Sequence, residues 1–537
     1  MFPPEFVFGT ATAAYQVEGA AREGGRGPSI WDEFSHTPGK TLNGDTGDVA
    51  CDQYHRYKED IALMVNMGMK AYRFSISWSR IMPSGRLPVN PEGVAYYSAL
   101  IQALLDHGIT PYVTLFHWDL PLTLEKEFGG WRSPEIVPCF RTYADTCFAL
   151  FGRSAPHWIT LNEPLCFTLC GYQWGIHAPG RSSNRLIFPQ GGNSAREPYV
   201  VMHHLLLAHA AAVDAFRLRF GSHSGMSIGL AVDGEWAEPL TSSPADVQAA
   251  ERRMQFQLAW VLDPLFSGDY PAVMKQRVGD RLPSFTPEQQ QQLKGSLDFV
   301  AAGTSAAGVV PLLPHESPAL AASAQGRASE ESGAAAAVVC GEDEGDHFKD
   351  QGVEISASRD GIPIGERAAS EWLYIAPWGF TRLLNWITAR YNRPPILITE
   401  NGMDDADDAL PPLDWTSLSQ TPVRGIQGSG SQENGAETLQ QPYDSIQLPA
   451  ALDDWKRVRF YNEYLGAVAD AMRDGADVRG YFAWSLLDNF EWAMGYSRRF
   501  GIHYVDFAHG GARFPKRSAL WWRHVLCEPE DSMTAAE

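Results

Sequence analysis

The sequence lacks any run of apolar residues that approaches the roughly 20 needed to cross a membrane. It also contains no Asn-x-Ser/Thr sequon, which is the acceptor for N-glycosylation in secreted proteins. Its first residues, Met-Phe-Pro-Pro-Glu-Phe, lack the basic and apolar regions of a secretory signal. These absences predict a cytoplasmic protein that does not associate with a membrane.

Cysteine is scarce, with seven residues in a chain of 537. This number is odd and too small for a disulfide framework, so we expect free thiols. Cys166 and Cys170 lie four residues apart, but no second pair of Cys or His residues completes a zinc set. The sequence also has no phosphate-binding loop. We therefore predict neither a metal nor a cofactor.

Positive charge is in short supply, because 43 Lys and Arg residues face 64 Asp and Glu residues, a net charge of −21. Such an acidic chain is a poor partner for nucleic acid or for an anionic membrane. We expect a small-molecule substrate instead. The oligomeric state cannot be inferred from the sequence.

Apolar residues are plentiful at 44 %, enough for a full core, and they occur in strand-like runs that alternate with helical periods. Helical patterns include residues 91–106, 200–219 and 378–391. Eight runs are candidate strands, namely residues 5–11, 71–78, 110–116, 157–161, 227–232, 297–302, 396–399 and 480–484. Eight β/α units in series predict a fold of the α/β class, a single (β/α)8 TIM barrel over residues 1–527, with residues 528–537 as a tail.

Two segments interrupt this alternation, at residues 303 to about 360 and 404 to about 450. Both are rich in small and polar residues such as Ala, Ser, Gly and Glu, and have little periodicity. We predict irregular or disordered insertions in the loops after the sixth and seventh strands.

Two glutamates stand directly after apolar runs. Glu163 ends the peptide His-Trp-Ile-Thr-Leu-Asn-Glu, and Glu400 follows Pro-Pro-Ile-Leu-Ile-Thr. The active site of a TIM barrel lies at the carboxyl ends of its strands, so both carboxyl groups are expected there. Glycosidic bond cleavage needs such a pair, one as proton donor and the other as base or nucleophile.

Six motifs in order resemble glycoside hydrolase family 1, the β-glucosidase family, over nearly the whole chain. They are Phe-Val-Phe-Gly-Thr-Ala-Thr-Ala-Ala-Tyr-Gln-Val-Glu-Gly, Tyr-Arg-Phe-Ser-Ile-Ser-Trp-Ser-Arg-Ile, Thr-Leu-Phe-His-Trp-Asp-Leu-Pro, Thr-Leu-Asn-Glu-Pro, Ile-Thr-Glu-Asn-Gly and Gly-Tyr-Phe-Ala-Trp-Ser-Leu-Leu-Asp-Asn-Phe-Glu-Trp. The resemblance implies a retaining exo-acting β-glucosidase that removes terminal non-reducing β-D-glucosyl residues by double displacement. Cellobiose-like oligosaccharides and aryl or alkyl glucosides are the expected substrates.

The resemblance also implies roles for individual residues. Glu163 matches the general acid/base and Glu400 the nucleophile, and Arg73 matches the cation that keeps the nucleophile ionised. In a retaining enzyme the two carboxyl groups lie about 5–5.5 Å apart. The matching sugar-binding residues are Gln16, His117, Asn162, Trp484, Glu491, Trp492 and Phe500, with Trp372 on the aglycone side.

Residue types within the family narrow the substrate. Phosphoglycosidases carry Ser and Lys where this chain has Glu491 and Trp492, and a carboxylate would repel a phosphate. Myrosinases replace the acid/base with Gln, whereas Glu163 favours ordinary O-glycosides. A β-galactosidase/β-fucosidase or a transglycosylase of the same family is the alternative.

The end of the sixth strand departs from the family pattern Asp-Phe-(Tyr/Ile)-Gly-x-Asn-His-Tyr-Thr. The chain has Gly303, Thr304 and Ser305 at its end, with Ser305 in place of the Tyr that donates a hydrogen bond to the nucleophile. Losing such a bond costs roughly 1.5–3 kcal/mol. Three explanations are open: another tyrosine substitutes, the protein is a catalytically impaired sugar-binding barrel, or the irregular segments are translated noncoding sequence.

Overall fold

The computed structural model covers residues 1–537 and describes residues 2–221, 225–305, 310–314, 345–406 and 443–527. Its centre is a closed barrel of eight parallel strands that neighbour one another in chain order, and the last strand pairs with the first. The strands are β1 (Val7–Ala11), β2 (Ala71–Ser75), β3 (Thr110–Phe116), β4 (His157–Asn162), β5 (Ser227–Asp233), β7 (Phe299–Ser305), β14 (Pro395–Gly402) and β16 (Asp477–Trp484). The predicted (β/α)8 barrel is confirmed.

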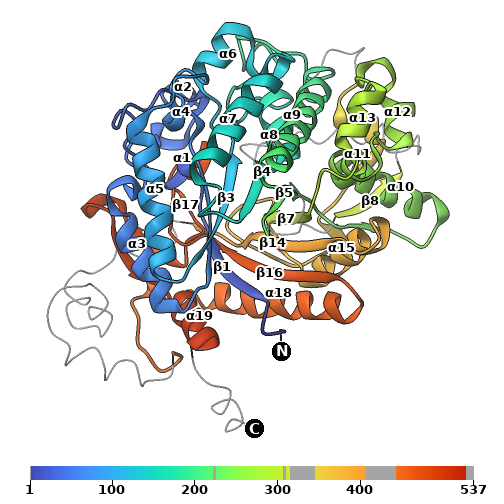
Figure 1. Ribbon diagram of the computed structural model, residues 1–537. Helices are drawn as coiled ribbons and strands as arrows, with labels where there is room; N and C mark the ends of the chain where they lie inside the picture. The colour runs from blue at the N-terminus through green and yellow to red at the C-terminus, as the bar shows by residue number, and fades with distance from the viewer. Residues whose placement is uncertain (1, 222–224, 306–309, 315–344, 407–442, 528–537) are drawn as a thin grey trace, which may run out of the picture.

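Helices surround the barrel and connect its strands (Figure 1). The main ones are α3 (Gln53–Met67), α5 (Pro91–Asp106), α7 (Ile136–Phe151), α9 (Glu197–Phe220), α11 (Trp260–Ser267), α15 (Pro377–Arg390), α18 (Trp455–Arg473) and α19 (Arg517–Cys527). α5 begins where the sequence signals it, because the Asn90 side chain accepts a hydrogen bond from the Glu92 backbone N–H at 3.3 Å and Pro91 occupies the first turn.

Two strands differ from the predicted runs in a way that matters for the site. The second strand ends at Ser75, and Trp78 instead begins the short helix α4 (Trp78–Ile81). The sixth strand, β7, continues three residues past the predicted end at Ala302, because its backbone pairs with β14 as far as Ser305. Pairing with a neighbouring strand extends β7 into a stretch whose composition predicts irregular structure.

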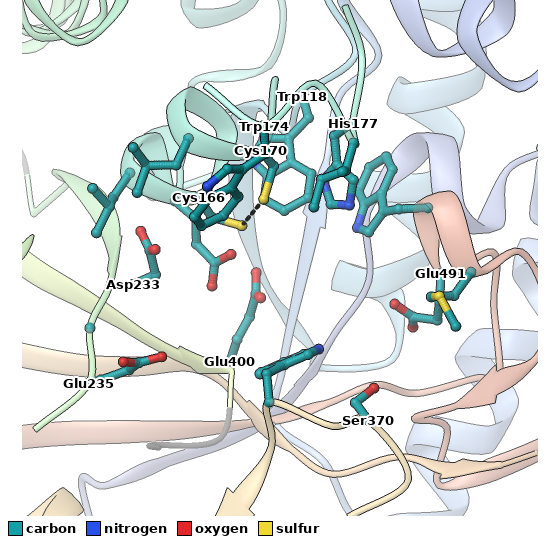
Figure 2. A pocket seen from close by; sticks show the side chains of 18 of the residues that line it. Trp118, Cys166, Cys170, Trp174, His177, Asp233, Glu235, Ser370, Glu400 and Glu491 are labelled. Atoms are coloured by element: carbon teal, nitrogen blue, oxygen red, sulfur yellow. Dashed lines mark hydrogen bonds between the residues drawn. The ribbon is translucent and has the colours of Figure 1, made fainter. Parts of the chain in front are cut away.

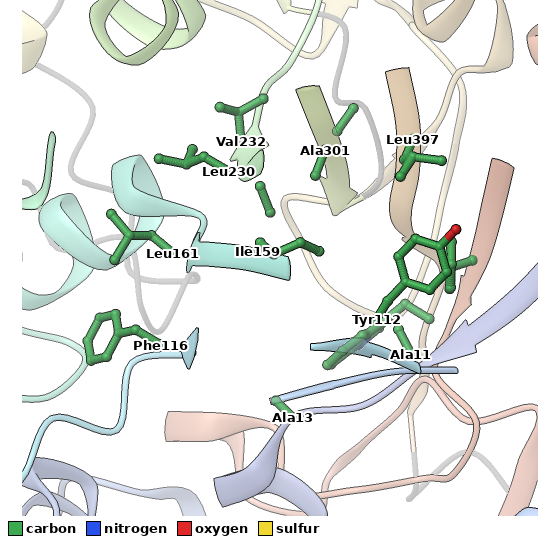
Figure 3. Packing of buried hydrophobic residues seen from close by; sticks show 14 of the residues in the cluster. Ala11, Ala13, Tyr112, Phe116, Ile159, Leu161, Leu230, Val232, Ala301 and Leu397 are labelled. Carbon is green, nitrogen blue, oxygen red and sulfur yellow. The ribbon is translucent and has the colours of Figure 1, made fainter. Parts of the chain in front are cut away.

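Buried apolar side chains fill the interior of the barrel (Figure 3). They come from different strands, for example Ile159 on β4 and Ala301 on β7, which are fully buried. Such a filled interior is a packed core and not a channel. The polar residues at the carboxyl ends of the strands therefore sit on a rigid base.

Shorter elements form the loops. The helices are α1 (Ala14–Val17), α2 (Ile30–Ser35), α6 (Leu122–Phe128), α8 (Pro164–Tyr172), α10 (Pro244–Met254), α12 (Ala272–Val278), α13 (Pro287–Leu293) and α14 (His347–Gln351). The strands are β6 (Ala237–Pro239), β8 (Val310–Pro314), β9 (Val353–Ile355), β10 (Ser358–Arg359), β11 (Ile362–Pro363), β12 (Glu366–Arg367), β13 (Tyr374–Ile375), β15 (Asp405–Ala406), β17 (Arg498–Arg499), β18 (His503–Asp506) and β19 (Ala512–Pro515).

The two predicted insertions lie partly outside the described residues, at 306–309, 315–344 and 407–442. Where the first of them is described, it contains regular structure: residues 345–360 include α14, β9 and β10. β8 joins β6 and β9 in a small three-stranded sheet.

One helix among the described residues, α9, is long and apolar enough to cross a membrane by composition alone. Most of its apolar stretch is buried inside the protein, where α9 packs between α7, α8 and α13. This burial is what the core helix of a globular fold requires.

Candidate active site

The predicted site residues meet at a cavity of about 430 Å³, which lies at the carboxyl ends of β4, β14 and β16. Arg73 and Asn162 are the two that do not line it, because they lie beneath its surface, each 1 % exposed. The predicted residues that line the cavity are Gln16, His117, Glu163, Trp372, Glu400, Trp484, Glu491, Trp492 and Phe500. Figure 2 shows Glu400 between Asp233 on one side and Glu491 on the other.

Arg73 connects three strands below the cavity floor. Its Nη1 donates to the Glu400 carboxylate, and its Nη2 donates to Asn162 Oδ1 at 2.5 Å. Its Nε donates to Thr114 Oγ1 at 3.1 Å on β3. A planar guanidinium fixed on three sides holds the Glu400 carboxylate in one orientation.

Glu163 stands at the junction of β4 and α8 in a left-handed conformation, with φ 43° and ψ 63°. Such a conformation is costly for a non-glycine residue and is often found at functional sites. Burial raises the pKa of Glu163 well above its ordinary value, and the charges of Glu400 and Asp233 raise it further. Both effects favour the protonated form of the Glu163 carboxyl group.

Glu400 has a different environment. Burial raises the pKa of Glu400 as well, but the Arg73 guanidinium opposes that rise through its charge and its hydrogen bond. Within the described part of the chain, Arg73 is the residue whose side chain donates to this carboxylate. The side chain of Ser305, which replaces the family tyrosine, lies outside the described residues.

At the far end of the cavity, Gln16 and Glu491 lie side by side. Gln16 Nε2 donates to Glu491 Oε2 at 3.3 Å and to Asn489 Oδ1 at 2.9 Å. Burial raises the pKa of Glu491 well above its ordinary value, and the nearby charges of Asp404 and Glu400 add to the effect. An acid that holds its proton can both donate and accept a hydrogen bond.

His117 contacts both Asn162 and the ring of Trp484. Asn162 Nδ2 lies 3.1 Å from its Nε2, and burial together with the Arg73 charge lowers the His117 pKa well below its ordinary value. A neutral ring that accepts at Nε2 carries its proton at Nδ1 and can donate there.

Four polar atoms on the predicted site residues are buried and have no hydrogen-bond partner within the described part of the chain. They are Gln16 Oε1, His117 Nδ1, Glu163 Oε1 and Glu491 Oε1. A buried polar atom without a partner costs about 1–3 kcal/mol, so these atoms are expected to bind a polar ligand. A sugar ring offers several hydroxyl groups that can both donate and accept hydrogen bonds.

Aromatic rings form one wall of the cavity. The His117 ring stacks on Trp484 at 5.9 Å and on Trp492 at 6.0 Å between centroids. Phe500 is buried beside them, whereas Trp372 is 51 % exposed at the outer part of the cavity. The apolar face of a pyranose ring packs on such surfaces, and an exposed tryptophan at the rim can contact a leaving group.

Several lining residues were missed by sequence reasoning, of which Asp233 is the most important. Its buried carboxyl group lies at the end of β5, and burial raises its pKa to about 7. Asp233 follows the run of residues 227–232, so the pattern that identified Glu163 and Glu400 also identifies it. Trp174 and Phe348, whose rings stack at 5.5 Å, come from loops that have no such signal.

The described ranges contain no cluster of potential metal ligands. No three His, Cys, Asp or Glu side chains within them are placed to hold a metal ion. The described cysteines are free thiols, and no disulfide joins any two of them.

Comparison with known proteins agrees with this geometry. The model of the family "Glycosyl hydrolase family 1" matches residues 1–412 and 432–530. Beta-glucosidase 42 of Arabidopsis thaliana is 47 % identical over 534 residues, which are 99 % of this chain and 95 % of the relative.

Two solved structures are similar over 98 % of this chain. A mutant rice β-glucosidase in a covalent complex with Glc from GA4GE has a TM-score of 0.84 and 44 % identity, with 99 % of its chain covered. A β-glucosidase from the fungus Humicola insolens in complex with glucose has a TM-score of 0.82 and 40 % identity, with 98 % of its chain covered. The chain therefore belongs to glycosyl hydrolase family 1.

Proposed function

We propose that this protein is a retaining exo-β-glucosidase. The observation that carries the proposal is the contrast between two buried carboxyl groups at one cavity. Glu400 accepts a hydrogen bond from Arg73, whereas Glu163 Oε1 has no partner among the described residues and the Glu163 pKa is strongly raised. Two carboxyl groups whose environments differ in this way are suited to the roles of nucleophile and acid.

In the first step, the Glu400 carboxylate attacks the anomeric carbon and the bond to the leaving oxygen breaks. Glu163 gives its proton to that oxygen, and the aglycone leaves as a neutral alcohol. In the second step, Glu163 takes a proton from water, the water oxygen attacks the anomeric carbon, and Glu400 is released. Two inversions at one carbon retain the β configuration.

We expect Asn162 to stabilise the transition state of the first step. Its Oδ1 accepts from Arg73, so its orientation is fixed, and it lies next to Glu163 in the chain. We assign it to the sugar 2-hydroxyl, a contact that strengthens as positive charge develops at the anomeric carbon. Gln16, His117 and Glu491 are assigned to the other hydroxyl groups.

The cavity favours removal of one terminal sugar from a neutral substrate. Gln16 and Glu491 close its inner end, and Glu491 stands where phosphoglycosidases carry the Ser and Lys that bind a phosphate. The relatives' complexes with glucose support glucose as the bound sugar. Trp372, Trp174 and Phe348 add aromatic surface to the cavity, which suits aryl or alkyl aglycones and the second ring of cellobiose.

The stereochemical course tests the retaining mechanism directly. We expect proton NMR of the hydrolysis of p-nitrophenyl β-glucoside to show β-glucose first, with the α anomer appearing only by mutarotation. Initial formation of α-glucose would rule out the double displacement. A parallel assay with the β-galactoside and β-fucoside measures the preferred sugar, for which we expect the highest kcat/KM with glucose.

A further inference from the structure

A pair of thiols borders the same cavity as the catalytic glutamates. Cys166 and Cys170 lie on α8, the helix that Glu163 begins, and their Sγ atoms are 3.7 Å apart (Figure 2). Both side chains line the cavity. Residues three and seven positions after Glu163 fall on the same helix face as its own position. The thiol pair therefore adjoins the place where the leaving group must depart.

The geometry of the pair disfavours a disulfide. Residues four apart on a helix have Cβ atoms about 5–6 Å apart, whereas a disulfide needs about 3.5–4.5 Å. Closing the Sγ atoms from 3.7 Å to a bond would distort α8. A single larger atom bonded to both sulfurs needs a much smaller change, since two bonds of about 2.3 Å at the roughly 100° angle of a pyramidal trivalent centre span about 3.5 Å.

We propose that Cys166 and Cys170 form a dithiol site that captures one thiophilic centre with two sulfur ligands, such as trivalent arsenic, and so blocks the active site. An organoarsenic oxide, R–As=O, condenses with both thiols to give R–As(S–Cys)2 and one water. Two As–S bonds form, the As=O bond breaks, and both thiol protons leave with the oxygen. No oxidant or reductant is needed, because arsenic stays trivalent.

The surroundings favour such a ligand over reagents that attack one thiolate. Burial and the neighbouring Cys170, Glu163 and Asp233 raise the pKa of Cys166 well above its ordinary value, so its thiol stays neutral. Neutral thiols react slowly with alkylating agents. Leu169 and Trp174 line the cavity beside the pair and provide an apolar surface for an aryl group.

Phenylarsine oxide is the probe for this site. We expect it to lower wild-type hydrolysis of p-nitrophenyl β-glucoside at least tenfold, with recovery on adding 2,3-dimercaptopropanol but not equimolar 2-mercaptoethanol. Cys166→Ser should keep the basal rate of the wild type, and Cys166→Ser and Cys170→Ser should each keep their own basal rate when the probe is added. Cys139→Ser is the matched control, because Cys139 lies on α7 and does not line the cavity. When the probe is added, this variant should lose activity as the wild type does.

Intact-mass measurement makes the test independent of activity. One phenylarsenic group per folded wild-type chain is expected, mapped to the peptide that holds both cysteines, and none after either substitution at the pair. Unchanged sensitivity of Cys166→Ser or Cys170→Ser would overturn the proposal, as would release of the adduct by 2-mercaptoethanol. If a variant folds poorly, the mapped adduct on the wild type still decides the outcome.

Discussion

At the scale of single residues, the two glutamates that we assign to catalysis differ in the charges that surround them. Arg73 reaches Glu400 from below, whereas Asp233 adds negative charge near Glu163. The first arrangement stabilises a carboxylate and the second stabilises a protonated acid. Substitutions at these positions therefore have different and measurable effects.

Glu163→Gln removes the proton donor and leaves the nucleophile in place. We expect kcat/KM for cellobiose to fall about 10²–10⁴-fold, the usual contribution of general acid catalysis. The first step with 2,4-dinitrophenyl β-glucoside should be much less affected, because that leaving group needs little protonation. Steady-state kinetics with both substrates, with and without azide, measure this. Equal losses on both substrates would contradict the assigned role.

Asp233→Asn should change the pH profile. The Asp233 charge raises the pKa of Glu163, so its removal lowers that pKa. The acid then loses its proton at lower pH, and the alkaline limb of kcat/KM moves to lower pH. The other groups that act on Glu163 are Glu400, Arg73 and Cys170, which the variant retains. An unmoved alkaline limb, measured with an unactivated glucoside, would contradict this account.

The sequence predicts most of these residues because they follow apolar runs or belong to family motifs. Glu163 and Glu400 are found by either signal. Asp233 satisfies the first but stands outside the quoted motifs. Trp174 and Phe348 reach the cavity through the path of their loops, and no local pattern indicates that path.

At the scale of elements, the end of β7 lies beside the carboxyl group of Glu163, the proposed acid/base. Gly303 stands on β7 opposite Asp233 of β5, and a Cβ atom there would lie 2.9 Å from Glu163 Oε1. The family has asparagine at this position. Glycine therefore leaves the Glu163 carboxyl group space that a side chain would occupy.

Gly303→Ala should displace the Glu163 carboxyl group and lower kcat on cellobiose by about 10–100-fold, since small misplacements of a catalytic group are costly. Gly466→Ala on α18 is the matched control, because nothing lies within 4 Å of an added Cβ there. The control should keep its activity and gain up to about 1 kcal/mol in stability. Equal kcat values for both variants and the wild type would contradict the role given to Gly303.

The barrel elements could be predicted because each strand is a buried apolar run, whereas the short loop strands could not. β9 pairs with β8, and β12 with β13, over two or three residues each. Such short strands depend on partners that are distant or follow a tight turn, and they leave no periodic pattern. The extension of β7 to Ser305 likewise depends on pairing with β14.

At the scale of the whole molecule, buried acids make stability depend on pH. Burial raises the pKa of Asp119 to about 7, above the value near 4 of an unfolded aspartate. Between these two values the folded state binds more protons than the unfolded state. The contribution of Asp119 to the free energy of unfolding is therefore fully present below about pH 4 and is lost as the pH rises through about 7.

Asp119→Asn should remove this part of the pH dependence. We compare the free energy of unfolding of the variant with that of the wild type at each pH. We expect this difference, variant minus wild type, to be larger at pH 8 than at pH 5 by on the order of a few kcal/mol. Urea unfolding at the two pH values measures the difference. The same stability difference between variant and wild type at both pH values would report only a packing effect and would contradict the raised pKa.

The central claim is that Glu400 is the nucleophile of an active β-glucosidase, despite the altered end of β7. Hydrolysis of p-nitrophenyl β-glucoside by the purified wild type and by Glu400→Gln tests it most directly. We predict turnover by the wild type and a loss of several orders of magnitude in the variant. No turnover by a folded wild type, or an active Glu400→Gln variant, would contradict the account.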